Sequence, residues 1–576
     1  MDRSYANGPA AAGLDKWLKW LAIGVSSVLI IVCLVTWTHV AGTYGVDVIR
    51  GDQWGAPANQ ILAMLDGRLT IDKLAAQHNE TRKPIPNLLS IAILAWSGHF
   101  NTQAELFVGF GLGTIILAIV AWLAWLTFRR AAEVAILTGA FCSLLWSSRT
   151  FYFHMYSITF ERLIPELCLV LMLAIVLWRG VTWSTVLFVA VCAFVAQYSY
   201  AGGAALWGLA VIFILIAYPG DWRANLTKIV AFVLASAISS YFYFVDYSRP
   251  PHHSELWSMF DQSIGDMLKF FFMILGNAVD ARGFAALILG LMVFVPFAVL
   301  FVLFLLRPPS DDHRARHAVW FVIGGYSISQ ALLAMIGRLP MSIGHALRRD
   351  YVTHSMYIFV ASIALLLLAA PERFRFAIGS AVLMLSVALT STLAMPEFWK
   401  EAKAHERNYE HAKACVRLVK LYADENCLDR LYHRFEHRLE KFTSKNRLMR
   451  PQMVETATVG TPANGEVASL SVENGLLRAE GWAQIGKSPA DAVIAAIPAD
   501  GNPRILAIAR VGSQGDASAD RGGSGRPDSS WRIETSVEGT DVDRCTLRFF
   551  AFDNAGDTLR PIDRNLTASP DQPGCR

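Results

Sequence analysis

The charged residues best suited to chemistry lie in a long polar segment, Tyr44 to Pro86, between two hydrophobic stretches. A carboxylate at a membrane surface can take the proton of an acceptor hydroxyl or orient a metal ion, and cations can stabilise a departing phosphate. Charges this close to a bilayer of low dielectric are costly and tend to mark function. We therefore expect catalytic carboxylates at Asp52, Asp47 and Glu80, and substrate contacts from Arg50, His78 and Arg82.

The same loop also has a purely structural interpretation. Asp52 and Glu80 can form salt bridges or cap interfacial helices, His78 can be a surface histidine, and Asn79 to Arg82 can form a turn. The stretches QILAMLDG and LTIDKLAAQH resemble two short amphipathic helices, after which Pro84 and Pro86 break the pattern. The clustering of acids and cations favours function for Asp52, whereas the surface interpretation is favoured for His78.

A second charged cluster follows much later, in GRLPMSIGHALRRDY. Arginines can bind phosphate through bidentate, charge-assisted hydrogen bonds, although any outer basic loop can also anchor lipid headgroups. The residues expected to contact substrate here are Arg338, His345, Arg348, Arg349 and Tyr351. Weaker candidates are Arg162 with Glu161 and Glu166, and the pair His252-His253.

The elements that must hold these residues are membrane helices. The chain has 576 residues, of which 54% are hydrophobic and only 17% charged, with a net charge of +4. This composition predicts a polytopic membrane protein, and we find no nucleic-acid-binding motif. Hydropathy predicts about 11 transmembrane helices, at residues 17–40, 104–128, 132–147, 163–178, 182–198, 203–218, 227–246, 284–306, 318–336, 356–370 and 376–394.

Basic residues orient these spans. Lys16 and Lys19 lie at the start of the first span, so the positive-inside rule places the N-terminus in the cytoplasm and the 41–103 loop outside. With eleven spans, everything after Trp399 is extracytoplasmic. The transmembrane domain is then 1–397, followed by a helical hairpin at 398–450, a linker at 451–466 and a small all-β sandwich at 467–576.

Cysteine usage agrees with an exported tail. Four of the eight cysteines lie in predicted spans, and Cys415, Cys427, Cys545 and Cys575 lie in the tail. An even number there suits an oxidising compartment. We expect Cys415 to pair with Cys427 across the turn YADEN, and Cys545 to pair with Cys575. In the sandwich, Trp482 and Trp531 can bind sugar, but core packing is the commoner role of tryptophan in such a fold.

The first outer loop, with its acidic residues and two juxtamembrane helices, resembles the GT-C superfamily of polyprenyl-phosphate-sugar-dependent glycosyltransferases. GDQW, DGRLT, HNETR and GRLPMSIGHALRRDY also resemble a group of bacterial membrane proteins assigned to the same activity. Two features differ. Many GT-C enzymes have adjacent acids where this chain has Asp52-Gln53, and the bacterial group has histidine at Thr81 and serine-arginine-tyrosine at Arg349-Asp350-Tyr351.

The resemblance implies an enzyme of the bacterial inner membrane. Its donor would be a polyprenyl-phosphate-linked sugar, its acceptor an envelope glycan or lipid, and an optional divalent metal, Mg²⁺ or Mn²⁺, would be held by Asp52. Two other functions remain open. A transporter or flippase of lipid-linked sugars predicts ionisable residues buried mid-span and repeated halves, but the spans contain almost no mid-membrane charge and we detect no internal repeat. A non-catalytic envelope scaffold would tolerate replacement of Asp52.

Overall fold

The computed structural model describes residues 9–250, 256–279, 282–432, 439–499, 502–512, 527–538 and 542–563. The chain forms two compact units. The helical unit contains residues Met1–Thr43, Thr70–Leu89 and Gln103–Trp399, and the C-terminal unit contains Tyr44–Leu69, Ser90–Thr102 and Lys400–Arg576. The polar loop, expected to supply the catalytic carboxylates and several substrate contacts, is therefore divided between the two units.

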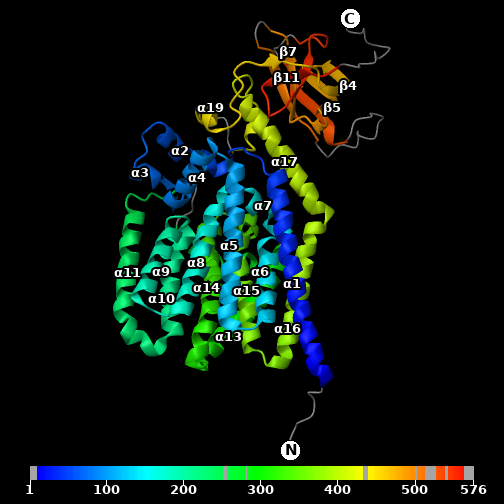
Figure 1. The fold of residues 1–576 in the computed structure, drawn as a ribbon. Helices are drawn as coiled ribbons and strands as arrows, with labels where there is room; N and C mark the ends of the chain where they lie inside the picture. The colour runs from blue at the N-terminus through cyan, green and yellow to red at the C-terminus, as the bar shows by residue number, and fades with distance from the viewer. Residues whose placement is uncertain are drawn as a thin grey trace, which may run out of the picture. The chain divides into compact units, whose positions relative to one another are not determined.

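Every predicted span falls on a helix of the helical unit (Figure 1). Seven helices in the described residues are long and apolar enough to cross a membrane, or eight if the bent pair Ala131–Leu145 and Ser148–Met155 is one span. The count of eleven stays a prediction. The helices are α1 Pro9–Tyr44, α5 Thr102–Phe128, α6 Ala131–Leu145, α7 Phe151–Met155, α8 Phe160–Arg179, α9 Trp183–Gln197, α10 Ala205–Ala217, α11 Trp222–Phe244, α13 Gly283–Leu306, α14 Asp311–Arg338, α15 Val352–Ala369 and α16 Glu372–Ser391.

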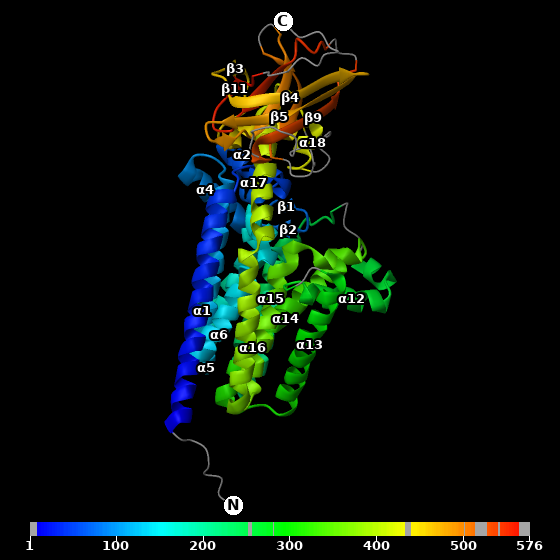
Figure 2. The same cartoon turned by 90° about the vertical axis from the view of Figure 1, so that its right-hand side faces the viewer.

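Burial separates the helices of this unit into two groups. Most side chains of α15 are buried, and α14 packs along it (Figure 2). By contrast, α11 and α13 leave many of their large apolar side chains exposed, as lipid-facing helices do. The central pair α14 and α15 therefore forms the rigid support for residues at its ends.

Two apolar helices, α4 and α12, were not predicted from the sequence. Pro84 and Pro86 do not end a helix but begin one, α4 Pro84–Ser97, because proline suits the first helical turn, where its missing N–H is not needed. α12 Ile264–Gly276 packs against α13, and the approach is close because both Gly276 and Gly290 lack a side chain. At only 13 residues, α12 is shorter than a typical span.

The first outer loop contributes short elements to both units. The C-terminal unit takes η1 Gly51–Trp54 and α2 Ala58–Leu65, and the helical unit takes α3 Ile71–Leu74 with the strands β1 Gln77–His78 and β2 Thr81–Arg82. The two expected short helices are thus present, the second reduced to a single turn. They do not belong to the same unit.

An apolar core explains why half of the loop joins the C-terminal unit. Ile49, Trp54 and Phe100 are buried together with Leu418 and Leu428 of the tail. Burial of side chains this large contributes about 1.5–3 kcal/mol each. The predicted boundary at 397 therefore omitted two segments, 44–69 and 90–102, that complete the tail's own core.

The tail begins with α17 Pro396–Arg417, whose end is joined through Cys415 to Cys427 of α18 Glu425–Leu428 by a disulfide. The second half of the expected hairpin is shorter than predicted, with α19 Leu439–Lys445 as its last helix. Cys545 is also disulfide-bonded, and its expected partner Cys575 lies outside the described residues.

Two β-sheets follow and pack on each other. One has the order β3-β11-β10-β7-β8, and in the other β4, β5 and β6 are joined by β9, which pairs with β5. Trp531 lies in the core between them, stacked on Phe549, as a core aromatic rather than an exposed sugar platform. The predicted linker contributes all of β3 and the start of β4. The strands are β3 Thr458–Val459, β4 Asn464–Glu473, β5 Leu476–Ile485, β6 Ser488–Pro489, β7 Ala492–Ile497, β8 Arg504–Arg510, β9 Ser530–Ser536, β10 Arg548–Phe552 and β11 Thr558–Pro561.

Candidate functional site

A small hairpin presents Glu80 to the end of the helical unit. Strands β1 and β2 pair antiparallel, and Asn79 turns the chain with φ of 52°, a left-handed conformation that asparagine tolerates. The side chain of Arg82 fixes the hairpin, because its Nε donates to the Tyr243 carbonyl at 2.8 Å and its Nη1 to the Ala75 carbonyl at 3.1 Å. Arg82, expected to bind substrate, is thus engaged by backbone carbonyls.

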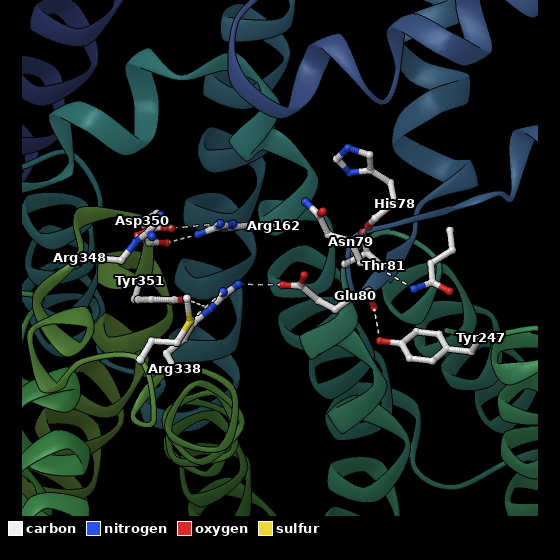
Figure 3. Close-up of polar contacts among 12 residues, drawn as sticks. His78, Asn79, Glu80, Thr81, Arg162, Tyr247, Arg338, Arg348, Asp350 and Tyr351 are labelled. Atoms are coloured by element: carbon white, nitrogen blue, oxygen red, sulfur yellow. Dashed lines mark hydrogen bonds and ion pairs between the residues drawn. The ribbon is translucent and has the colours of Figure 1, made fainter. Parts of the chain in front are cut away.

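Glu80 meets the second predicted cluster directly (Figure 3). Its Oε1 lies 3.2 Å from Nη2 of Arg338, the last residue of α14, and Arg338 Nε donates to the Tyr351 hydroxyl at 3.2 Å. The hydroxyl of Tyr247 donates to the Glu80 carbonyl at 3.5 Å. Burial, together with the nearby Glu80 charge, raises the pKa of Tyr247. Glu80 and Arg338, 258 positions apart in the sequence, therefore belong to one line of polar contacts.

A second group of charges adjoins this line. Asp350 is buried, and its carboxylate accepts two hydrogen bonds from Arg348. Arg348 Nε donates to Oδ1 and Nη2 donates to Oδ2, each at 3.0 Å. Arg162, from the first turn of α8, donates to the Asp350 carbonyl and lies 3.4 Å from its carboxylate. Burial opposes the charge of Arg348, but Asp350 outweighs it and raises the pKa of Arg348. Two arginines share one carboxylate, so the group carries excess positive charge.

The remaining residues of the second cluster support its loop. His345 Nδ1 lies 3.4 Å from the Arg338 carbonyl, and Arg349 is exposed. Two further residues that hold this loop, Arg149 and Asn277, were not predicted from the sequence. Arg149 Nη2 donates to the Leu347 carbonyl at 3.0 Å, and Asn277 Nδ2 donates to the Arg348 carbonyl at 2.8 Å. Both lie outside any charged run, so no local pattern in the sequence marks them.

A large apolar groove borders the hairpin on its other side. Its volume is about 900 Å³, and α9, α10 and α11 supply its walls. Phe194, Trp207 and Phe242 are among its lining residues, and Arg82 lies at the polar end. Since Glu80 and Arg82 belong to one short hairpin, the charged cluster and the apolar groove are neighbours.

The other half of the loop is a separate polar group in the C-terminal unit. Asp47 accepts from the Thr102 backbone N–H at 2.8 Å, and its other oxygen lies 2.9 Å from His99 Nε2. Arg50 is buried, with its guanidinium 4.1 Å from the centre of the Tyr409 ring. Asp52 is exposed on η1. The structure thus brings Glu80 to the second cluster, whereas Asp47 and Arg50 contact residues of the C-terminal unit.

Comparison with known proteins gives one match. No family model and no curated protein matches the chain. Among solved structures, it is similar to ArnT from Cupriavidus metallidurans bound to undecaprenyl phosphate, with 14% sequence identity and a TM-score of 0.38. The match covers 76% of this chain and 82% of that one. Similarity at this level establishes neither a shared fold nor a shared activity.

Buried carboxylates lie near the start of α5 and α8, and the prediction of almost no mid-membrane charge stays a prediction. Glu105 of α5 and Glu166 of α8 are fully buried, and Glu161 forms a buried ion pair with Lys83 at 2.9 Å. Glu166 Oε1 lies 3.1 Å from His354 Nδ1, and the Tyr357 hydroxyl donates to Oε2 at 3.2 Å.

The described residues offer a poor site for the expected Mg²⁺ or Mn²⁺. Such ions prefer several oxygen ligands at once. Within the described ranges, His411, Cys415 and Cys427 form the only group of three or more potential ligands, and its two cysteines are joined in a disulfide. Binding of a metal ion at Asp52 therefore stays a prediction.

Proposed function

We propose that this protein is a membrane glycosyltransferase that moves a sugar from a polyprenyl-phosphate donor to an envelope glycan or lipid on the extracytoplasmic side. The observation that carries the proposal is the cluster Glu80–Arg338–Tyr351 beside the apolar groove. A polyprenyl-phosphate sugar has an anionic head and a long apolar chain. The charged cluster suits the anionic head, and the apolar groove suits the apolar chain.

The arginines have the leading role in this mechanism. Arg338 and Arg348 would bind the donor phosphate and stabilise the charge that develops on it as the glycosidic bond breaks. Arg162 would keep Asp350, and with it Arg348, in place. The polyprenyl chain would lie in the groove, against Phe194 and Phe242, where its burial supplies affinity without specificity for the sugar.

A carboxylate has to take the proton of the acceptor hydroxyl. Glu80 is one candidate, because an acceptor that displaces its contact with Arg338 would meet a carboxylate oxygen. Asp52, the carboxylate favoured by the sequence, is the other, because its side chain is exposed. Asp47 is the weakest candidate, since both of its oxygens already accept hydrogen bonds.

Binding of a short-chain polyprenyl phosphate to the purified protein tests the proposal. Arg338→Gln should weaken binding at least tenfold, as expected from the loss of a charge-assisted contact of about 1.5–3 kcal/mol. Arg307→Gln, an exposed arginine after α13, is the matched control and should leave it unchanged. Equal binding by both variants would contradict the assigned phosphate site. A reporter fused after Arg450 should be active only if exported, and cytoplasmic activity would contradict the proposed sidedness.

One observation favours the alternative of a transporter. Fully buried ionisable residues inside membrane helices often mark proton or ion pathways, and Glu166 with His354 is such a pair. Transport of a lipid-linked sugar in proteoliposomes would then depend on both residues and on a proton gradient. Sugar transfer to an acceptor with no gradient present would support the transferase instead.

A further inference from the structure

We propose that a pocket at the other end of the helical unit binds an anionic glycerophospholipid. The pocket has a volume of about 340 Å³ and lies between residues 18–22 of α1 and the first turns of α6 and α16. The three helices run side by side in Figures 1 and 2. A pocket of this size takes a head group and the upper part of an acyl chain. It is independent of the Glu80 cluster and of the proposed transfer reaction.

Helix packing explains why the pocket opens there. Deeper in the unit the helices touch through small residues, since a Cβ on Gly139 of α6 would lie 3.1 Å from Ser26 of α1. Further along, Thr390 of α16 lies 3.0 Å from Ser143 and 3.8 Å from Cys33. Toward the pocket such small-residue contacts give way to larger side chains, and Leu21 and Phe376, which line the pocket, are 60% and 55% exposed.

The chemistry of the lining is that of a lipid site. Apolar side chains form one part of the wall, including Leu21, Ile136 and Leu383. Three basic residues, Lys19, Arg130 and Arg375, lie with two acidic ones, Glu133 and Glu372. Arg130 contacts both carboxylates, at 3.6 Å and 3.0 Å, and the formal charge of the lining is three minus two, or +1. This balance favours a phosphodiester head group with net negative charge over a zwitterionic one.

Exposed tryptophans place the pocket at the level of lipid head groups. Trp17 and Trp20 of α1 are 77% and 61% exposed, and Trp178 and Trp183 are exposed at the same end of α8 and α9. Tryptophan concentrates at the membrane–water interface because its ring is apolar and its N–H is polar. The cations of the pocket therefore lie where phosphate groups lie, and its apolar wall lies where acyl chains begin.

Native mass spectrometry of the full-length protein, extracted in mild detergent and exchanged into mixed phosphatidylglycerol and phosphatidylcholine, tests this proposal. We expect one retained lipid per chain, with phosphatidylglycerol preferred at least fivefold. The double variant Lys19→Gln/Arg375→Gln should lose that preference. The control Arg223→Gln/Arg307→Gln removes the same charge from exposed positions at the same end and should keep it.

A second variant separates a built pocket from general lipid contact. Ala22→Trp fills the pocket and should abolish retention of both lipids, while the elution volume and helical circular dichroism stay unchanged. Equal retention by Ala22→Trp and wild type would overturn the proposal, because the lipid would then lie elsewhere. Equal preference for phosphatidylglycerol in the two double variants would also overturn it. So would the finding that a helix of another protein, or of a second copy of this chain, occupies the pocket in place of lipid.

Discussion

The two halves of the first outer loop use the same residue types in opposite ways. In the half that belongs to the C-terminal unit, Arg50 is buried against Tyr409, and Asp47 is bonded to Thr102 and His99. In the half that belongs to the helical unit, Glu80 is only half-buried and reaches Arg338 at the end of α14. Charges in the first half chiefly hold a domain together, whereas those in the second half meet further charges beside a groove.

This difference shows that closeness in sequence does not define a site. The loop leaves α1, joins the tail's apolar core through Ile49 and Trp54, and then returns to the helical unit with α3. Charged residues of one loop, such as Arg50 and Glu80, can therefore serve different units. Variants that separate effects on sugar transfer from effects on folding therefore test the difference between the two halves of the loop most directly.

The largest expected effect distinguishes the two candidate bases. If Asp52 takes the acceptor proton, Asp52→Asn should lose about two to four orders of magnitude in transfer rate, the usual contribution of a positioned acid or base. Folding should be unaffected because the side chain is exposed. Asp66→Asn, which removes another carboxylate of the same loop half, is the control. Full transfer by Asp52→Asn, measured in membranes supplied with lipid-linked sugar, would exclude this role and leave Glu80 as the candidate.

A smaller loss of transfer is expected from Glu80→Gln and Arg338→Gln. Each removes one partner of the 3.2 Å contact, and we expect tenfold to hundredfold lower kcat/KM, or about 1.4–2.8 kcal/mol of transition-state stabilisation. The double variant should lose less than the sum of the two single losses, because the pair shares one interaction. Additive losses in this double-mutant cycle would show that the two residues act separately.

Arg50→Gln should change stability instead of transfer. It removes a buried cation stacked on Tyr409, a contact worth about 1–3 kcal/mol including its hydrogen bond. Thermal unfolding in detergent should occur at a lower temperature, with binding of polyprenyl phosphate unchanged at low temperature. Arg68→Gln, whose side chain is 68% exposed, is the matched control. Loss of binding without loss of stability would place Arg50 with the substrate-binding residues after all.

The smallest expected effect is a pH dependence in the same half of the loop. The hydrogen bond with Asp47 raises the pKa of His99, although burial partly opposes this. A raised folded-state pKa stabilises the fold fully below the unfolded value of about 6.5, and this stabilisation is lost as pH rises through the folded value. Thermal stability should therefore fall slightly from pH 6 to pH 8, by about 1 kcal/mol or less. Asp47→Asn should flatten this dependence, and an unchanged slope would contradict the linkage.

Much of the fold was predictable because membrane helices follow from hydropathy alone. Each of the eleven predicted spans falls on a helix, since a backbone in lipid must satisfy its hydrogen bonds within the segment. Two elements were missed for physical reasons. α4 begins with two prolines, which the pattern treated as breakers, and α12 is shorter than a span. The pairing of Cys415 with Cys427 followed from their positions on either side of a turn.

By itself, the sequence determined the membrane helices, the β-rich end and the identity of two charged clusters, because each is a local property of composition and spacing. Only the tertiary structure decided which charges meet. Glu80 and Arg338 are 258 residues apart, and Arg149 and Asn277 lie in no motif, so their contacts depend on how helix ends converge. The division of the loop between the two units was also not predictable from the sequence. It follows from apolar side chains such as Trp54 and Phe100, which are buried with residues of the tail although the tail is distant in sequence.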